Sequence, residues 1–326
     1  MQISVIGSGN WGSAIAKILS KKNDVLLYTR SEEIEKEINK NHINKKYFPN
    51  IKLDNIVATT DLKRALKNKY IVNAIPAQST RVVFEKYKNF LDSSKTLVNL
   101  SKGLEINTNY RMSEVFKDIN NEVNYAIISG PSYAIEVINE MPTAVVCASN
   151  KLEIAKEIQK IFATDFFRLY TSDDVVGVEL GGSLKNILAL SIGIADGIGY
   201  ESNPKAALIT RGLHEMERFA KFMGAKEETL MGLSGVGDLI LTSTSLESRN
   251  FSCGRLIGTG VDPKEAEKQI GTVEGIATTK AIYELSKKMK IYMPITEQTY
   301  KILFEKKDPK ISVIDLMKKD MKDEGQ

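Results

Sequence analysis

The chain of 326 residues contains few of the side chains that build metal centres and disulfide frameworks. Its two cysteines, Cys147 and Cys253, form no CxxC pair, and its two histidines, His42 and His214, lie far apart along the chain. We therefore expect no metal site and no disulfide framework, and we expect a reducing, cytoplasmic location. Because His214 lies in a helical run, we expect it to be structural rather than catalytic.

The chain also lacks blocks of like charge, internal repeats and low-complexity segments. Its 45 Lys and Arg residues are interspersed with 41 Asp and Glu residues, which gives a net charge of +4. This pattern does not indicate a nucleic-acid partner, whereas it is compatible with an anionic small molecule. The length is sufficient for two domains with separate cores.

We expect neither a leader peptide nor a membrane span. Strand-like residues begin at Gln2 without a preceding basic region or cleavage site, so we expect no signal peptide. The most apolar long stretch, residues 178–199, is interrupted by charged residues such as Lys185, which argues against an integral membrane segment. We expect the charged tail, residues 318–326, to be frayed.

A glycine-rich motif, GSGNWG, follows the first predicted strand, residues 2–6, and precedes a predicted helix over 13–19. This is the strand–GxGxxG–helix order of a dinucleotide-binding unit. In such a unit Gly7 permits the tight turn, Gly9 lets the backbone approach the pyrophosphate, and Gly12 lets the helix pack closely. The free N–H groups at the helix start face the phosphates. The motif predicts a dinucleotide site; the alternative is a glycine-rich turn without a ligand.

The second predicted strand, residues 25–28, is followed by Arg30, where an NAD-specific site usually has Asp or Glu. An arginine there favours tolerance of the 2′-phosphate of NADP, although a solvated arginine after a strand is the alternative. Glu32 and Glu33 follow, and either would restore a preference for NAD if it turned inward. We expect the chain to use both coenzymes, with a lean to NADP.

Alternation of strands and helices continues to about residue 174. Further strands are predicted over 56–58, 70–75, 96–100, 125–129, 143–148 and 166–170. Apolar strands separated by helices indicate an α/β fold, a doubly wound parallel sheet covered on both faces. Since ligands of such sheets lie outside the carboxyl ends of the strands, we expect Pro76, Lys102 and the segment Gly130 to Ser132 around one crevice.

Helices dominate the second half of the chain. They are predicted over 178–198, 204–223, 264–269, 273–288, 294–304 and 311–318. Residues 231–258 read as a polar, glycine-containing insert between these helices. We therefore expect a dinucleotide-binding domain over 1–175 and an all-helical substrate domain over 176–326.

Lys185 lies on the apolar face of the first of these helices. Gly181 and Gly182 precede it by one turn and Ala189 follows by one turn, so we expect room for a ligand beside the ammonium group. Asp196 lies about three turns further, near the same face. Desolvation would lower the pKa of such a lysine and suit it to acid–base catalysis. The alternative is a lysine whose side chain reaches solvent from an interfacial helix.

The polar insert contains a second candidate cation. Arg249 lies between Ser248 and Asn250 and follows Asp238 and Thr242. A fork-shaped guanidinium flanked by hydrogen-bonding side chains suits a phosphate or carboxylate. The alternative is a loop stabilised by its own Ser and Asn turn chemistry.

Taken together, these motifs identify a family resemblance. They are GSGNWG, SKGLE, GPSYAIEV, ELGGSLKNILA, IADGIG, LSGVGDLILT, SRN and VEG, in this order from end to end of the chain. The chain resembles the NAD(P)-dependent glycerol-3-phosphate dehydrogenases of the bacterial type. The resemblance implies a Rossmann-type N-terminal domain, a helical C-terminal substrate domain, and reversible reduction of dihydroxyacetone phosphate to sn-glycerol 3-phosphate, which supplies the phospholipid backbone.

The resemblance also assigns roles to particular residues. It implies that Lys185 is the catalytic lysine, with Lys102, Asp238 and Thr242 lining the reacting centre. It implies a substrate-phosphate clamp of Arg249 and Asn250, with Asn186, Ser248, Gly130 and Ser132 nearby. It implies coenzyme contacts from Gly7, Gly9, Asn10, Trp11, Gly12, Arg30, Tyr47, Pro76, Lys102, Ala134, Arg249 and Glu274. Phe251 and the segment 245–247 depart from the usual pattern around the arginine.

Two other functions remain open at this point. One is a related two-domain dehydrogenase that acts on another small hydroxy compound, and the other is a non-catalytic coenzyme-binding sensor. A sensor needs an output module, and no helix-turn-helix or basic recognition helix is evident. The sequence does not determine the oligomeric state, for which a homodimer is one expectation.

Overall fold

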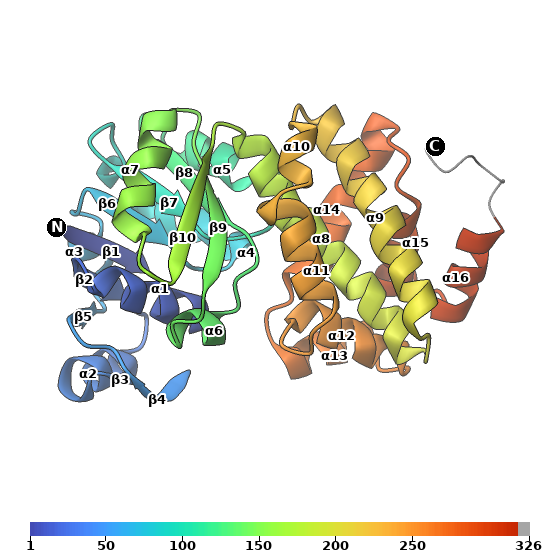
Figure 1. Ribbon diagram of the computed structural model, residues 1–326, viewed down its shortest axis with the longest axis horizontal. Coiled ribbons are helices and arrows are strands. Elements are labelled where there is room, and N and C mark those ends of the chain that lie inside the picture. The colour runs from blue at the N-terminus through green and yellow to red at the C-terminus, as the bar shows by residue number, and fades with distance from the viewer. Residues whose placement is uncertain (319–326) are drawn as a thin grey trace.

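The computed structural model describes residues 1–318, and it places a sheet domain beside a helical domain (Figure 1). The strands are β1 Gln2–Ile6, β2 Asp24–Tyr28, β3 Ile43–Asn44, β4 Phe48–Lys52, β5 Ile56–Thr59, β6 Tyr70–Asn73, β7 Thr96–Asn99, β8 Asn124–Ser129, β9 Thr143–Ala148 and β10 Phe167–Ser172. The helices of this half are α1 Asn10–Ser20, α2 Glu32–Asn41, α3 Leu62–Ala65, α4 Ala77–Phe84, α5 Met112–Ile119, α6 Ala134–Ile138 and α7 Leu152–Phe162, with a 3₁₀ turn over Glu85–Phe90.

Eight strands form one sheet in the order β10-β9-β8-β7-β6-β1-β2-β5. One apolar cluster, which includes Ile15 of α1 and Ile158 of α7, covers one face, and another, which includes Phe84 of α4 and Phe116 of α5, covers the other. Strand β1 lies inside the sheet and pairs in parallel with β2 and β6. The prediction of a doubly wound sheet covered on both faces is therefore confirmed.

The expectation that every strand of this sheet runs parallel is wrong for the last two. Strand β9 pairs antiparallel with β8, and β10 then pairs parallel with β9. A parallel return needs a crossover that spans the sheet, usually through a helix. The only helix between β8 and β9, α6, has five residues, which span only about 7.5 Å. The chain therefore turns back beside β8 instead of crossing over.

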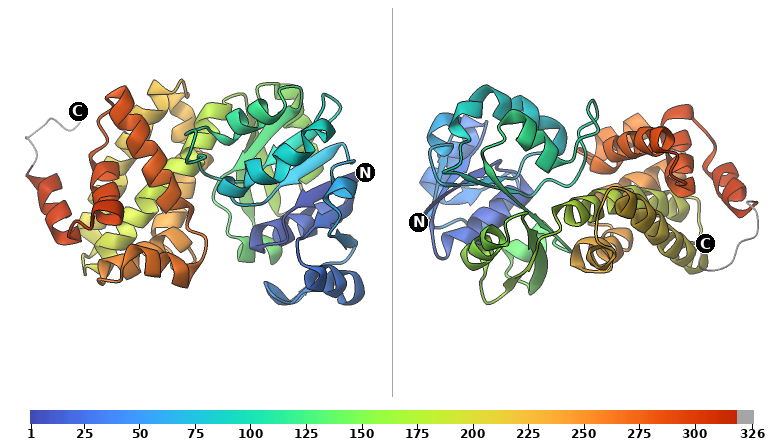
Figure 2. Two further views of the ribbon diagram at one scale, coloured as in Figure 1. Left: turned by 180° about the vertical axis from the view of Figure 1, so that it is seen from behind. Right: turned by 90° about the horizontal axis from the view of Figure 1, so that it is seen from above.

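The helical half is built around α8, Val175–Gly197, which is buried along nearly its whole length (Figures 1 and 2). The other elements are α9 Ser202–Phe222, α10 Glu227–Leu230, a π-helical turn over Leu233–Gly237, α11 Asp238–Ser243, α12 Arg249–Gly258, α13 Pro263–Ile270, α14 Glu274–Met289, α15 Pro294–Glu305 and α16 Pro309–Met317. By its length and apolar composition alone, α8 could cross a membrane. However, 89% of the apolar 18-residue stretch that gives it this character is buried inside the protein, as in the core helix of a soluble protein.

The prediction of a polar insert over residues 231–258 is wrong. This segment forms the π-helical turn, α11 and α12, and all three pack against α8. Its glycines and small polar residues suggested a loop, yet most of the glycines lie where neighbouring backbones touch, and Ser248 caps α12. Composition alone hid the helices because the residues that allow close packing are also typical of turns. The expectation of a frayed tail falls largely on residues 319–326, outside the described residues.

Candidate active site between the sheet domain and the central helix

The glycine-rich loop has the geometry of a pyrophosphate cradle. Gly7 has a φ of 115°, and its N–H donates to the carbonyl of Tyr28 at 3.1 Å. A Cβ on Gly12 would lie 1.9 Å from the carbonyl oxygen of Gly7, so only glycine lets α1 pack this closely. A Cβ on Gly9 would meet nothing within 4 Å, which leaves open space where a dinucleotide approaches the loop. These residues fit a dinucleotide.

The start of α1 presents its N–H groups to this space. Its N-cap is Gly9, which offers no side-chain hydrogen bond, and Asn10 and Trp11 form the first turn, with Asn10 exposed. Uncapped N–H groups at a helix start attract phosphate. Sequence reasoning missed Asn44, whose buried Nδ2 donates to Ser8 O and Ser13 Oγ, both at 2.9 Å. It holds the loop from a two-stranded β3–β4 hairpin that the sequence pattern did not predict.

The segment after β2 leaves Arg30 available to a ligand. Arg30 is exposed, and Ser31 Oγ accepts a hydrogen bond from Ile34 N and caps α2. Glu32 and Glu33 are both exposed, so neither turns inward. The structure therefore brings no carboxylate from these two residues to the end of β2.

The remaining coenzyme candidates either pack against the core of the sheet domain or lie where it meets the helices. Trp11, Tyr47 and Ala134 are partly buried and pack against the apolar cluster that includes Ile15 of α1. Pro76 is the exposed N-cap of α4. The next N–H, that of Ala77, donates to Glu274 Oε1 at 3.2 Å, and burial raises the pKa of the Glu274 carboxyl.

Two lysines from different domains converge on one carboxylate. Lys102 Nζ lies 2.6 Å from Asp238 Oδ2 and donates to Gly130 O at 2.9 Å. Lys185 Nζ lies 3.1 Å from Asp238 Oδ1 and donates to Thr242 Oγ1 at 2.7 Å. Thr242 Oγ1 in turn donates to Asp238 O at 2.5 Å. The structure therefore brings Lys102, which follows strand β7, together with Lys185 of helix α8.

Burial decides the electrostatics of this cluster. Lys185 is only 7% exposed, so its side chain does not reach solvent. Desolvation lowers the pKa of Lys185 to about 8; Asp238 acts against this shift, while Lys102 and Arg249 add to it. For Asp238 burial would raise the pKa, but the two lysines outweigh it and hold the pKa below its usual range. The site therefore holds an ionised aspartate beside a lysine whose pKa is about 8.

The expectation that Gly181 and Gly182 leave room for a ligand beside Lys185 is wrong. A Cβ on Gly181 would lie 2.7 Å from Ser234 O, and one on Gly182 would lie 2.6 Å from Ser129 Oγ. The space that these glycines leave is therefore filled by protein, because glycine admits a neighbouring segment as readily as a ligand. Asp196 pairs with Lys205 at 2.7 Å and Arg255 at 3.2 Å near the far end of α8, not with the site.

The predicted phosphate clamp lies at the start of α12. Ser248 Oγ accepts from Phe251 N at 3.2 Å and so caps α12, and Arg249, the first residue of the helix, is exposed. Asn250 Nδ2 donates to Asn186 Oδ1 at 2.9 Å, and Asn250 Oδ1 accepts from Gly275 N at 2.8 Å. Most of the Asn250 amide is thus used inside the protein.

The remaining substrate candidates are held by hydrogen bonds within the protein. Asn186 Nδ2 donates to Lys102 O at 3.3 Å, and Ser132 Oγ donates to Gly130 O at 2.9 Å. Tyr133, which sequence reasoning missed, donates from its hydroxyl to Leu241 O at 2.9 Å. This bond ties the segment after β8 to α11, which carries Asp238 and Thr242. An aromatic residue in a loop gave no signal of such a role.

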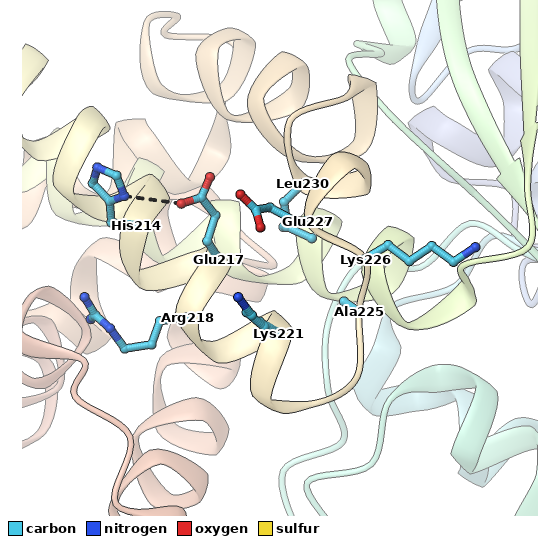
Figure 3. A pocket seen from close by; sticks show the side chains of 8 residues that line it. All are labelled: His214, Glu217, Arg218, Lys221, Ala225, Lys226, Glu227 and Leu230. Carbon is cyan, nitrogen blue, oxygen red and sulfur yellow. Dashed lines mark hydrogen bonds and ion pairs between the residues drawn. The ribbon is translucent and has the colours of Figure 1, made fainter. Parts of the chain in front are cut away.

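A separate surface hollow of about 200 Å³ lies between α9 and α10 (Figure 3). Its walls carry both signs of charge and include His214, whose Nδ1 lies 3.2 Å from Glu217 Oε2. None of the predicted site residues lines it. Among residues 1–318 no group of three or more His, Cys, Asp or Glu side chains is arranged to hold a metal ion.

Comparison with known proteins places this geometry in a family. Residues 2–155 match the family model described as the N-terminus of NAD-dependent glycerol-3-phosphate dehydrogenase, and residues 174–313 match that of its C-terminus. The chain is 48% identical over 328 residues to glycerol-3-phosphate dehydrogenase (NAD(P)+) of Thermoanaerobacter sp., with 99% of each chain covered. It is 45% identical to the enzyme of that name from Clostridium botulinum, again with 99% of each covered.

Solved structures agree with the sequence matches. The crystal structure of glycerol-3-phosphate dehydrogenase from Coxiella burnetii is 39% identical, covers 98% of this chain and 99% of its own, and superposes with a TM-score of 0.93. The Plasmodium falciparum glycerol-3-phosphate dehydrogenase gives a TM-score of 0.91 at 27% identity, with 99% and 97% covered. The chain therefore belongs to the NAD-dependent glycerol-3-phosphate dehydrogenase family, as an NAD(P)-dependent oxidoreductase with a Rossmann-type sheet domain and a helical domain.

Proposed function

We propose that this chain reduces dihydroxyacetone phosphate reversibly to sn-glycerol 3-phosphate, and that Lys185 exchanges the proton. The observation that carries this assignment is the cluster of buried Lys185 and Asp238 with partly buried Lys102, beside the exposed Arg249. The cluster and Arg249 together hold three cations and one aspartate. Such a site suits a small substrate that carries a phosphate and develops negative charge on a carbonyl oxygen.

The coenzyme, when bound to the glycine-rich loop, supplies or accepts the hydride. In reduction, protonated Lys185 donates its proton to the oxygen on C2 as negative charge develops there. Lys102 adds positive potential at the same point, and Asp238 orients both ammonium groups through its two carboxylate oxygens. In oxidation, neutral Lys185 accepts the hydroxyl proton.

The substrate phosphate is held away from the reacting carbon. Arg249 offers two parallel N–H groups to this anion. The backbone N–H groups of Arg249 and Asn250, which the Ser248 cap does not use, lie at the start of the same helix. Ser248 shapes this turn as its N-cap, while Asn186 and Asn250 hold α12 against α8. Binding energy at the phosphate is thereby converted into alignment of the ketone.

A substrate comparison tests the proposal. Purified protein is assayed for oxidation of NADH and NADPH with dihydroxyacetone phosphate and with unphosphorylated dihydroxyacetone. The expected result is turnover of the phosphorylated ketone with at least one coenzyme and a much weaker rate without the phosphate. Folded protein that binds coenzyme but shows no turnover above background would support the coenzyme sensor instead. Comparable rates on both ketones would support a dehydrogenase of another hydroxy compound.

The proposal also covers features that the site itself does not address. It assigns coenzyme binding to residues 1–175 and substrate binding to residues 176–326. It also includes a cytoplasmic location, a homodimeric state and delivery of the product to phospholipid synthesis. Sedimentation of the purified protein would test the homodimer directly.

A further inference from the structure

Four glycines bring α8 and α12 into backbone contact. Gly193 and Gly197 lie one turn apart on α8, and Gly254 and Gly258 lie one turn apart on α12. A Cβ on Gly193 would lie 2.1 Å from Phe251 O, and a Cβ on Gly254 would lie 2.1 Å from Leu190 O. The same holds one turn further on. A Cβ on Gly197 would lie 2.2 Å from Arg255 O, and a Cβ on Gly258 would lie 2.2 Å from Ile194 O. No side chain fits at any of the four positions without moving a backbone.

The two helices run parallel, and their register determines where α12 begins. The contacts advance together along both helices, from Leu190 with Gly254 to Ile194 with Gly258. One turn before the first of these, Asn250 Nδ2 donates to Asn186 Oδ1 at 2.9 Å. The first turn of α12 therefore lies beside the turn of α8 that carries the catalytic lysine.

This register brings the two ends of the proposed site together. Arg249 is the first residue of α12, and Lys185 directly precedes Asn186 on α8. The charge of Arg249 adds to the lowering of the pKa of Lys185 that burial and Lys102 produce, so the two cations lie close enough to interact. One helix thus carries the proton donor, the other carries the phosphate clamp, and glycines fix the gap between the helices.

We propose that Gly193, Gly197, Gly254 and Gly258 form a spacer that sets the separation of Lys185 and Arg249 to the length of a three-carbon phosphorylated ketone. The proposal rests on the function inferred above. In such a substrate a short chain of bonds of fixed length joins the phosphorus to C2. Once Arg249 holds the phosphate, the gap between α8 and α12 therefore decides where the carbonyl lies relative to Lys185.

Alanine at the spacer must widen this gap. The atoms that its methyl group would meet are backbone carbonyls, which cannot rotate away as a side chain can. Helices without glycine contacts pack about 8–10 Å apart, and glycine pairs allow a closer approach. A displacement of the reacting atoms by about 1 Å can lower the rate by about 10²-fold. The spacer therefore predicts a loss of alignment rather than a loss of phosphate binding.

The test compares Gly193→Ala and Gly254→Ala with the unmodified chain. With dihydroxyacetone phosphate, kcat is expected to fall by roughly 10- to 100-fold, while KM stays within about threefold because Arg249 still binds the phosphate. With unphosphorylated dihydroxyacetone, kcat/KM is expected to stay within about threefold, because that substrate does not span the two cations. A thermal melt and a coenzyme titration establish that each variant is folded.

Gly212→Ala is the matched control. Gly212 lies on α9 and contacts α8 from another side, where its Cβ would lie 2.6 Å from Cδ1 of Leu188, the end of a flexible side chain. The control is expected to leave the ratio of the two ketones unchanged. If Gly254→Ala does not fold, Gly258→Ala at the end of α12 tests the next contact of the same two helices, that with Ile194 O. A smaller fall in kcat is expected there because Gly258 lies further from Arg249.

The outcomes separate the spacer from the proposed function. Equal losses on both ketones, or a folded Gly193→Ala or Gly254→Ala with an unchanged kcat for the phosphorylated ketone, would overturn the spacer. An unmodified chain that does not turn over dihydroxyacetone phosphate would refute the proposed function itself. Retention of dihydroxyacetone activity together with a selective fall in kcat for the phosphorylated ketone would support the spacer.

Discussion

The two halves of this enzyme prepare for their ligands in different ways. The sheet domain offers mainly backbone groups to its ligand. Gly7 forms a close turn, the space beside Gly9 is open, and the start of α1 has no side-chain cap. The helical domain presents buried charge, because α8 and α11 carry Lys185 and Asp238 in an almost fully buried cluster. Backbone N–H groups bind phosphate at any pH, whereas a buried lysine changes its charge with its surroundings.

This difference predicts where substitutions act. Replacing one side chain in the sheet domain removes only part of the coenzyme contact, because the backbone donors stay. Replacing one side chain in the helical domain removes a charge that the chemistry itself needs. Four experiments, from the largest expected effect to the smallest, test this contrast.

Substitution of the proton donor is expected to have the largest effect. Lys185→Met keeps much of the stem and removes the ammonium group, so the loss of acid–base catalysis should lower kcat by roughly 10²–10⁴-fold. Coenzyme affinity should be nearly unchanged, because the coenzyme contacts of the sheet domain remain. Steady-state kinetics and a coenzyme titration measure both quantities. A kcat within a few fold of the unmodified chain would mean that Lys185 is only structural.

Loss of the phosphate clamp is expected to be the next largest effect. A bound phosphate would cover Arg249, and removing one partner of a buried, hydrogen-bonded charge pair costs about 2–5 kcal/mol. Arg249→Ala should therefore lower kcat/KM for dihydroxyacetone phosphate by roughly 30-fold or more. The weak activity on unphosphorylated dihydroxyacetone should barely change. Equal losses on both substrates would assign Arg249 another role.

Substitution of Arg30 in the coenzyme site is expected to have a smaller effect, on the preference between NADPH and NADH. A hydrogen bond to a charged group contributes about 1.5–3 kcal/mol, so Arg30→Ala should shift the NADPH/NADH ratio of kcat/KM toward NADH by roughly tenfold or more. The ratio is measured for both proteins at one ionic strength, because salt screens an exposed arginine. An unchanged ratio would remove Arg30 from the 2′-phosphate. An unmodified chain inactive with NADPH would refute the use of both coenzymes.

The last experiment measures how the rates of the unmodified chain depend on pH. Because the pKa of Lys185 is lowered to about 8, the lysine is protonated below that pH and neutral above it. The kcat/KM for ketone reduction should be constant below about pH 8 and fall above it, and that for alcohol oxidation should fall below it. Asp238→Asn removes the carboxylate that favours the ammonium form, so the same limb should move to lower pH. Profiles in which both directions respond to pH alike would exclude Lys185 as the titrating group.

Much of the fold follows from local patterns. Apolar strands, the strand–GxGxxG–helix order and the long apolar run around Lys185 predicted the covered sheet, the dinucleotide loop and the central helix, because each signal lies within about 20 residues. The direction of β9 was not predictable in this way, since it depends on whether a short connection crosses the sheet. The helices α11 and α12 were hidden because their glycines resemble those of a turn.

The candidate site was likewise predictable only in part from the sequence. The sequence by itself determined which residue types are available: a lysine on an apolar helical face, an arginine between Ser248 and Asn250, and glycines at the required spacing. Only the tertiary structure decided that Lys102 from the end of one strand and Lys185 from a helix share the carboxylate of Asp238. Only the tertiary structure showed that Gly181 and Gly182 admit protein rather than ligand. The physical reason is that burial and charge pairing, which determine the pKa of Lys185, depend on segments far apart in the chain that meet only when the two domains pack together.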